Sequence, residues 1–190
     1  MMSSQIDSTI TRRGLLSAFA ATAVVSAPVF ANATGYVKGA GSIRKLSMFS
    51  KRLGENVNTV YWIDGEYIDE AIFEISKLMR DWRQNEVKLV DRRTIDIIAA
   101  SQTLLETSQP FQLLSGYRSP RTNAMLRRQS RSVARKSLHM TAQAADLRMS
   151  GRSVRQISRA ALSCRSGGVG RYSRSNFVHM DCGPLRTWGR

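Results

Sequence analysis

Two histidines, His139 and His179, are the only ones among the 190 residues of the chain. His139 lies seven residues before Asp146 in the segment SLHMTAQAAD, and His179 lies two residues before Asp181 in the segment NFVHMDCG. Neutral imidazole and carboxylate groups are zinc ligands, and a catalytic zinc site uses three protein ligands and keeps a fourth position for water. The pattern indicates either a metal site or two ordinary core histidines with unrelated aspartates, and spacing alone does not choose between them.

Strand geometry offers a way to bring these groups together. Successive residues of a strand face opposite sides, so Ala144 and Asp146 share one face of the segment AADLRM. By the same rule, Phe177, His179 and Asp181 share one face of FVHMD. A histidine on one strand, an aspartate on another and a second histidine on a third could therefore converge on one ion.

The elements that must position these groups lie in residues 45–190, after a glycine-rich, weakly patterned lead-in at 34–44. Apolar periodicity and cap residues predict several helices, and short apolar runs predict strands. The predicted helices are 69–84, 91–108, 119–130 and 153–164, and the predicted strands are 58–63, 111–118 with its closing turn, 144–149 and 177–182. This order predicts an α+β domain with a small, largely antiparallel sheet and flanking helices.

Residues 1–33 have the order of an export leader. Arg12 and Arg13 precede a mildly apolar run at 15–30, and the small-x-small triplet that ends at Ala33 follows. This order predicts a signal peptide of the twin-arginine type, cleaved after Ala33, and a periplasmic or otherwise exported protein. The apolar run is short for a membrane span, so we expect no stable membrane insertion after cleavage, with an uncleaved anchor as the alternative.

The charge of the chain is strongly unbalanced, with 29 Lys and Arg against 14 Asp and Glu and a formal net charge of +15. A basic surface attracts polyanions, which include nucleic acids and the acidic polymers of a bacterial wall, or it is simply a soluble basic surface. The expected export argues against nucleic acid, and no aromatic-basic interleaving or known nucleic-acid module is present. The acidic wall is therefore the expected partner.

The chain has two cysteines, Cys164 and Cys182. An exported protein folds where disulfides form, so a single bridge between them is one expectation. Two free thiols are the other, because bridge formation depends on a geometry that the sequence does not give.

Three segments, SGYRSPRTNAML, SLHMTAQAADLRM and GGVGRYSRSNFVHMDCGPLRTW, closely resemble the YcbK-like exported bacterial proteins. These are related to the zinc D-Ala-D-Ala metallopeptidases, a group that includes lysostaphin-type enzymes and the hedgehog domain. The resemblance extends over residues 45–190 and implies a hedgehog or D-Ala-D-Ala-peptidase-like fold. It also implies one zinc ion per chain, with His139, Asp146 and His179 as its ligands.

The same resemblance assigns roles to two further residues. Arg118, in the SGYR segment, would face a carboxylate of the substrate or the developing oxyanion. Ser137 would contact the substrate or support the first ligand. In the family motif a glycine occupies the position of Ala142, so this chain carries one additional methyl group there.

The general base of the better-known relatives is missing. Those enzymes place a glutamate three residues, or a histidine two residues, before the third ligand, where this chain has Asn176 and Phe177. Asp181 is the nearest carboxylate and the candidate base. It could equally accept a hydrogen bond from a ligand imidazole and orient it.

Two hypotheses for function follow from these observations. The first is a zinc hydrolase of peptidoglycan peptide stems, of the D,D-endopeptidase or carboxypeptidase type, that acts in cell wall remodelling. The second is an exported peptidoglycan-binding protein that keeps the zinc site but has little or no catalysis. The sequence does not indicate an oligomeric state.

Overall fold

A computed structural model of the chain describes residues 42–131 and 133–189. The expected leader at 1–33 and nearly all of the lead-in at 34–44 lie outside the described residues. Within the described part, no helix has both the length and the apolar character needed to cross a bilayer.

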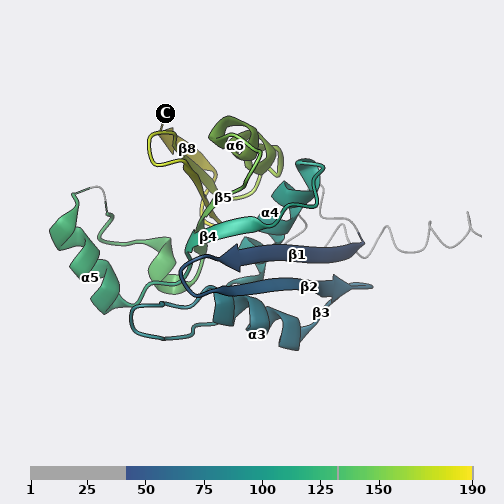
Figure 1. The fold of residues 1–190 in the computed structure, drawn as a ribbon, viewed down its shortest axis with the longest axis horizontal. Helices are drawn as coiled ribbons and strands as arrows, with labels where there is room; N and C mark the ends of the chain where they lie inside the picture. The colour runs from purple at the N-terminus through teal and green to yellow at the C-terminus, as the bar shows by residue number, and fades with distance from the viewer. Residues whose placement is uncertain (1–41, 132, 190) are drawn as a thin grey trace, which may run out of the picture. The chain divides into compact units, whose positions relative to one another are not determined.

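Strands and helices alternate irregularly along the chain (Figure 1), which confirms the α+β class. The strands are β1 (Ile43–Ser50), β2 (Glu55–Ile63), β3 (Glu66–Tyr67), β4 (Phe111–Ser115), β5 (Ala144–Arg148), β6 (Gly168–Tyr172), β7 (Phe177–Asp181) and β8 (Arg186–Gly189). The helices are α3 (Asp69–Leu78), α4 (Arg92–Leu104), α5 (Pro120–Gln129), α6 (Val154–Ser163) and the short 3-10 helix η1 (Leu138–Thr141).

All four predicted helices are present, but the first two are shorter than the periodicity suggested. α3 ends at Leu78 because Asp81 and Glu86 pair through their backbones and close the following segment into a turn. The starts of α5 and α6 follow the caps in the sequence. The Ser119 side chain accepts a hydrogen bond from the backbone of α5, and Ser153 forms a capping box at the start of α6.

The described strands form one sheet of eight, in the order β3-β2-β1-β4-β5-β7-β6-β8. The sheet is larger than the small one expected. It is also mixed, because β1 runs parallel to β4 and β6 runs parallel to β8 while the other neighbours are antiparallel. The short or glycine-rich strands β3, β6 and β8 carry too few apolar residues to have been recognised as strands.

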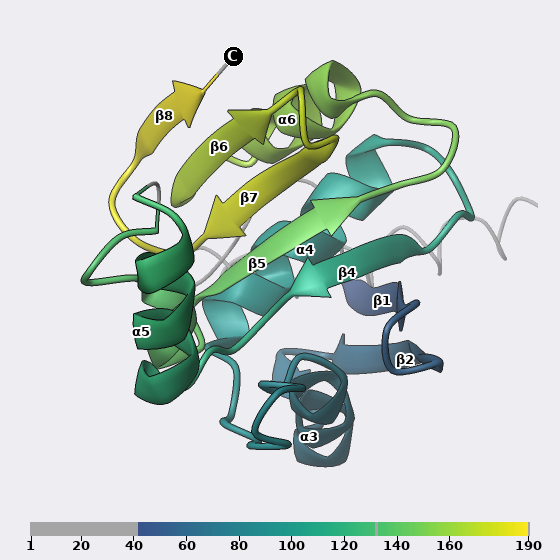
Figure 2. The same cartoon turned by 60° about the vertical axis from the view of Figure 1, so that its left-hand side comes forward.

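The two faces of the central strands differ in what covers them. α4 and α6 pack against the sheet behind β5 and β7 (Figure 2), and Leu147, Val178 and Met180 are fully buried. Strand alternation turns Asp146 and His179 to the opposite face, away from these helices. The apolar face therefore anchors the strands, and the polar face is left for a site.

A buried ion pair ties the first half of the sheet to α4. Arg44 of β1 donates to Asp96 of α4 at 2.8 Å, and both side chains are at most 2% exposed. The same carboxylate accepts hydrogen bonds from Tyr61 at 2.9 Å and from Tyr67 at 2.6 Å. One carboxylate thus joins β1, β2, β3 and α4.

Of the two alternatives for the cysteines, the structure has two free thiols and no bridge between them. Cys164 lies 3.7 Å from the hydroxyl of Ser101, and Cys182 lies beside Thr94. Ser101 and Thr94 are seven residues apart on α4, which corresponds to about 10 Å along the helix axis. A disulfide needs Cα atoms within about 7 Å, and the two thiols lie against different turns of α4.

We expect Asp96→Ala to lower the free energy of unfolding by about 3–5 kcal/mol, because it removes the carboxylate that faces the buried Arg44 charge. Asp69→Ala is the matched control, since the Asp69–Arg92 pair is 77% and 51% exposed and should contribute less than about 1 kcal/mol. Urea unfolding followed by circular dichroism measures both. Equal effects of the two substitutions would contradict the proposed importance of the buried cluster.

Candidate metal centre

Three side chains from three elements meet on the polar face of the sheet. Asp146 lies opposite His179 in the antiparallel register of β5 and β7, which brings their side chains together on one face. His139 comes from η1, where the Ser137 side chain caps the helix by accepting from the His139 backbone N–H at 3.4 Å. Ala142 follows the last residue of η1, and its left-handed backbone (φ 55°) turns the chain into β5.

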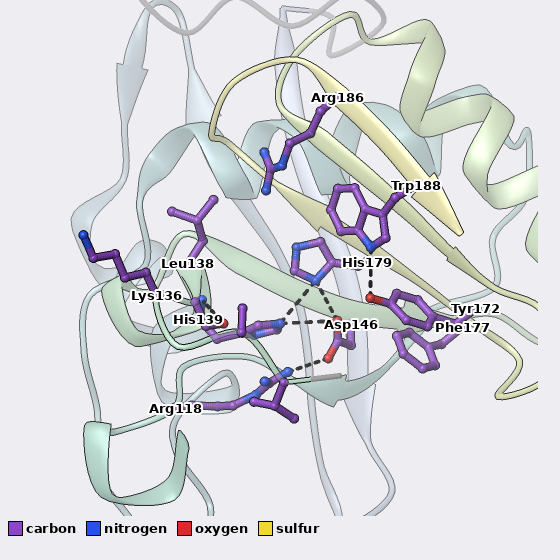
Figure 3. Close-up of a pocket in the computed structure, with 13 residues that line it drawn as sticks. Arg118, Lys136, Leu138, His139, Asp146, Tyr172, Phe177, His179, Arg186 and Trp188 are labelled. Atoms are coloured by element: carbon purple, nitrogen blue, oxygen red, sulfur yellow. Dashed lines mark hydrogen bonds and ion pairs between the residues drawn. The ribbon is translucent and has the colours of Figure 1, made fainter. Parts of the chain in front are cut away.

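The facing atoms of these side chains form a small triangle (Figure 3). His139 Nε2 lies 3.3 Å from His179 Nδ1 and 3.3 Å from Asp146 Oδ1. His179 Nδ1 lies 2.9 Å from the same Asp146 oxygen. The structure therefore brings together the three residues that the sequence resemblance assigned to one site.

The other nitrogen of each imidazole is committed to a backbone or carboxylate acceptor. His139 Nδ1–H donates to the Gly116 carbonyl at 2.7 Å, and His179 Nε2–H donates to Asp181 Oδ2 at 2.9 Å. These bonds set the tautomer of each neutral imidazole, so in the neutral forms the two nitrogens that face each other carry lone pairs. Burial alone would lower the pKa of His179, but its hydrogen bonds to Asp146 and Asp181 raise it, so a proton competes with a metal ion for His179 Nδ1. Burial also lowers the pKa of His139 and favours its neutral form. Three acceptors then converge, an arrangement that a cation stabilises.

The donor set fits zinc. With bonds of about 2.0–2.1 Å to nitrogen and oxygen, a tetrahedral zinc ion has ligand atoms about 3.3 Å apart, close to the sides of the triangle. The candidate ligands His139, Asp146 and His179 are only 2%, 9% and 9% exposed. All three residues also line a cleft of about 310 Å³. The site could thus hold a metal ion and admit a fourth ligand from the cleft.

Asp181 does not fit the expected role of general base. Its side chain is fully buried, and Oδ1 accepts from the backbone of Gly168 at 3.1 Å and of Gly183 at 2.9 Å. Arg186 donates to both oxygens, at 3.0 and 2.7 Å. Burial alone would raise the pKa of Asp181, but hydrogen bonds from His179 and Arg186 lower it to about 2. The geometry favours the alternative role, in which Asp181 orients His179.

Arg118 holds the carboxylate of Asp146 from the side away from the imidazoles. It donates to Asp146 Oδ2 at 2.7 Å and to the Ser115 hydroxyl at 2.8 Å, and it lines the cleft. Asp146 thereby keeps its Oδ1 atom directed at the imidazoles. The SGYR segment also supplies the carbonyl of Gly116, where a side chain would collide with Met79. Substrate contact by Arg118 and Ser137, both in the cleft wall, stays a prediction.

The rest of the cleft wall is aromatic and cationic. Among the described residues that line it, Asp146 is the sole carboxylate. The other lining residues include Lys136, Leu138, Tyr172, Phe177, Arg186 and Trp188. No lining side chain supplies the glutamate or histidine base of the better-known relatives.

The sequence reasoning missed how β8 completes the site. β8 lies beside β6 in parallel, with Arg186 paired to Gly168 and Trp188 paired to Gly170. A Cβ atom on Gly168 would lie 2.6 Å from the Arg186 guanidinium, and one on Gly170 would lie 2.5 Å from the Trp188 indole. The two glycines therefore let both side chains cross β6 and reach the site residues of β7. Glycine alternates with valine in Gly168–Gly170, and two large side chains alternate with threonine in Arg186–Trp188. This matching pattern was the signal in the sequence that could have indicated the contact.

Comparisons with known proteins relate the chain to one family of peptidoglycan peptidases. A family profile described as peptidoglycan L,D-endopeptidase MepK matches residues 38–188. The chain is 43% identical over 145 residues to the peptidoglycan L,D-endopeptidase MepK of Escherichia coli K12, an alignment that covers 76% of this chain and 80% of the relative. It is 40% identical over 140 residues to a Haemophilus influenzae protein named as a probable enzyme of the same kind, covering 70% of this chain and 75% of that one.

If Asp181 orients His179, Asp181→Asn should weaken zinc binding by about 10–100-fold, because loss of a partner behind a ligand imidazole has effects of that size. Competition with a chromophoric chelator measures the affinity. Asp64→Asn, at an exposed turn between β2 and β3, is the control and should bind zinc like the unaltered chain. Unchanged zinc affinity together with lost activity in Asp181→Asn would instead favour a general base.

Proposed function

The chain belongs to the peptidoglycan L,D-endopeptidase MepK family, and from this we propose that it is a zinc-dependent peptidase of peptidoglycan peptides that acts in cell wall remodelling. The observation that carries the proposal is the triangle of His139 Nε2, Asp146 Oδ1 and His179 Nδ1 at one side of the cleft. We assign these three residues as the ligands of one zinc ion.

The bond we propose is an amide between an L- and a D-configured residue. The names of the relatives specify an L,D-endopeptidase, which differs from the D,D type expected from the sequence resemblance. An endopeptidase must bind substrate peptide on both sides of the scissile bond. The cleft beside the three candidate ligands is open to solvent, which is compatible with such a substrate.

The chemistry is divided between the metal and the side chains of the cleft. A bound zinc ion supplies Lewis acidity, which polarises a carbonyl and makes water nucleophilic near neutral pH. Arg118 holds Asp146 in place, and its positive charge would stabilise negative charge on a substrate carboxylate or on the reacting carbonyl oxygen. Ser137 would contact the bound peptide from the rim of η1.

Charge in the cleft suits an acidic peptide. Arg118, Lys136 and Arg186 line the cleft, whereas Asp146 is its one acidic member among the described residues. Carboxylate-bearing peptide stems would meet a wall of complementary charge, and the net charge of +15 would retain the protein on an acidic wall.

We also propose that residues 1–33 are a twin-arginine leader, that the protein acts in the periplasm, and that residues 45–190 have the hedgehog or D-Ala-D-Ala-peptidase type of fold. The support for the leader is the Arg12-Arg13 pair before an apolar run and an Ala-Asn-Ala triplet, and the support for the fold type is the resemblance of residues 45–190 to that group. Amino-terminal sequencing of the exported protein should begin at Thr34. A mature protein that keeps Met1 would overturn the cleavage proposal.

A second function, binding of peptidoglycan without hydrolysis, is favoured by one observation. Among the described residues, the cleft wall offers no carboxylate base, since Asp146 is paired with Arg118 and Asp181 is buried and fully hydrogen bonded. A zinc-loaded protein that sediments with sacculi but leaves their peptides intact would establish this alternative.

We expect the zinc-loaded protein to release new fragments from purified peptidoglycan, and mass spectrometry should locate the cut at an L,D amide bond. His139→Ala and His179→Ala should lose both the zinc, measured by elemental analysis, and the hydrolysis, because each removes one of three ligands. Asp69→Ala, on the exposed side of α3, should keep both.

Two results would overturn the assignment. If the wild-type protein takes up no zinc, the proposed metal site is overturned. If the zinc-loaded wild-type protein releases no fragment from peptidoglycan, the peptidase function is overturned and binding without hydrolysis is the function that remains.

A further inference from the structure

Tyr172 lies in the wall of the cleft, close to the candidate ligands. In the β6–β7 register Gly170 pairs with His179, and Tyr172 follows two residues later on the same face, paired with Phe177. Diagonal neighbours of this kind are about 7–8 Å apart, within reach of an aromatic side chain. Figure 3 shows the Tyr172 oxygen on the side of the ring that faces Asp146 and His179.

The hydroxyl of Tyr172 has a fixed hydrogen-bond direction. Trp188 Nε1 lies 2.9 Å from the Tyr172 oxygen, and an indole N–H can only donate. Tyr172 must therefore be the acceptor in this pair, which leaves its own O–H available to a different acceptor. In the described part of the chain, Trp188 is the partner of this hydroxyl, so the O–H can serve a molecule in the cleft.

The aromatic residues around Tyr172 hold it rigidly. Its ring stacks on Phe177 with centroids 4.4 Å apart and an angle of 11° between the planes. The centroids of the Trp188 and His179 rings are 5.2 Å apart, and the Trp188 indole lies over Gly170. A single indole thus fixes the hydroxyl relative to a candidate metal ligand, which is the preorganisation that a donor to developing charge requires.

We propose that Tyr172 is a catalytic residue whose hydroxyl donates a hydrogen bond to the carbonyl oxygen of the scissile amide as that oxygen becomes negative. The proposal rests on the peptidase function proposed above. Two nitrogens of Arg118 are already bonded to Asp146 and Ser115. Tyr172 therefore adds an uncharged donor that no acceptor among the described residues occupies.

The reaction balances without a proton from tyrosine. The oxygen of water bonds to the carbonyl carbon, the C–N bond breaks, and the amine leaves with a proton that comes from the water. Tyr172 keeps its proton throughout. Its hydrogen bond strengthens while the carbonyl oxygen carries negative charge and weakens again in the product, so it lowers the barrier more than it improves substrate binding.

Tyr172→Phe removes only the hydroxyl and keeps the ring that stacks on Phe177. With the zinc-loaded protein and a purified cross-linked muropeptide, kcat should fall about a hundredfold while KM stays nearly constant, because loss of one oxyanion donor has effects of about 10²–10³. A phosphinate peptide that mimics the tetrahedral state should lose affinity by a similar factor. Zinc content should stay at that of the wild type.

Two variants complete the experiment. Trp188→Phe keeps an aromatic ring but removes the N–H that orients the hydroxyl, and its kcat should fall by about tenfold, less than that of Tyr172→Phe. Tyr67 lies on β3, at the opposite end of the strand order, and its hydroxyl donates to Asp96 of α4. Tyr67→Phe removes that hydroxyl and should leave kcat unchanged.

The outcomes separate this proposal from the one on which it rests. Full kcat in Tyr172→Phe, or a raised KM at constant kcat, would overturn the role of the hydroxyl while the peptidase function stands. Loss of zinc in Tyr172→Phe would show a supporting role in the metal site and would also overturn it. An inactive wild-type protein would instead overturn the peptidase function itself.

Discussion

The convergence of three hydrogen-bond acceptors is the constraint around which this structure is built. His139 Nε2, His179 Nδ1 and Asp146 Oδ1 lie within 3.3 Å of one another and are largely removed from water. Lone pairs at such distances repel unless a proton or a metal ion lies among them, and buried acceptors without a partner destabilise a fold. The centre is therefore an arrangement that folding opposes and metal binding favours, so the surrounding residues must hold it in place.

Each member of the triangle is held from behind by a group from another part of the chain. The Gly116 carbonyl orients His139, Arg118 holds the second oxygen of Asp146, and Asp181 orients His179. Asp181 is itself held by Arg186 from β8. The site consequently depends on strands β4 to β8 together, and the mixed sheet is the framework that makes the geometry reproducible.

The chemistry of the cleft differs from that of hydrolases that place a glutamate beside the metal. Its one carboxylate among the described lining residues faces the imidazoles, and the remaining polar groups are cations and hydroxyls. Such groups can bind an acidic peptide and stabilise an oxyanion, but they are poor proton acceptors at neutral pH. The site is better equipped to stabilise negative charge than to remove a proton, so nucleophile activation would rest mainly on the metal.

Local patterns in the sequence determined much of this protein. Strand alternation placed Asp146 with Ala144 and His179 with Asp181, each pair on one face of its own strand, and Ser119 and Ser153 marked the starts of α5 and α6. Faces and caps depend on near neighbours, whereas the register that sets Asp146 opposite His179 does not. The tertiary structure alone decided the size of the sheet, the separation of the cysteines and the burial of Asp181 beneath Arg186. Those features arise from strand pairing and packing between distant segments, and nothing in a single segment encodes its partner.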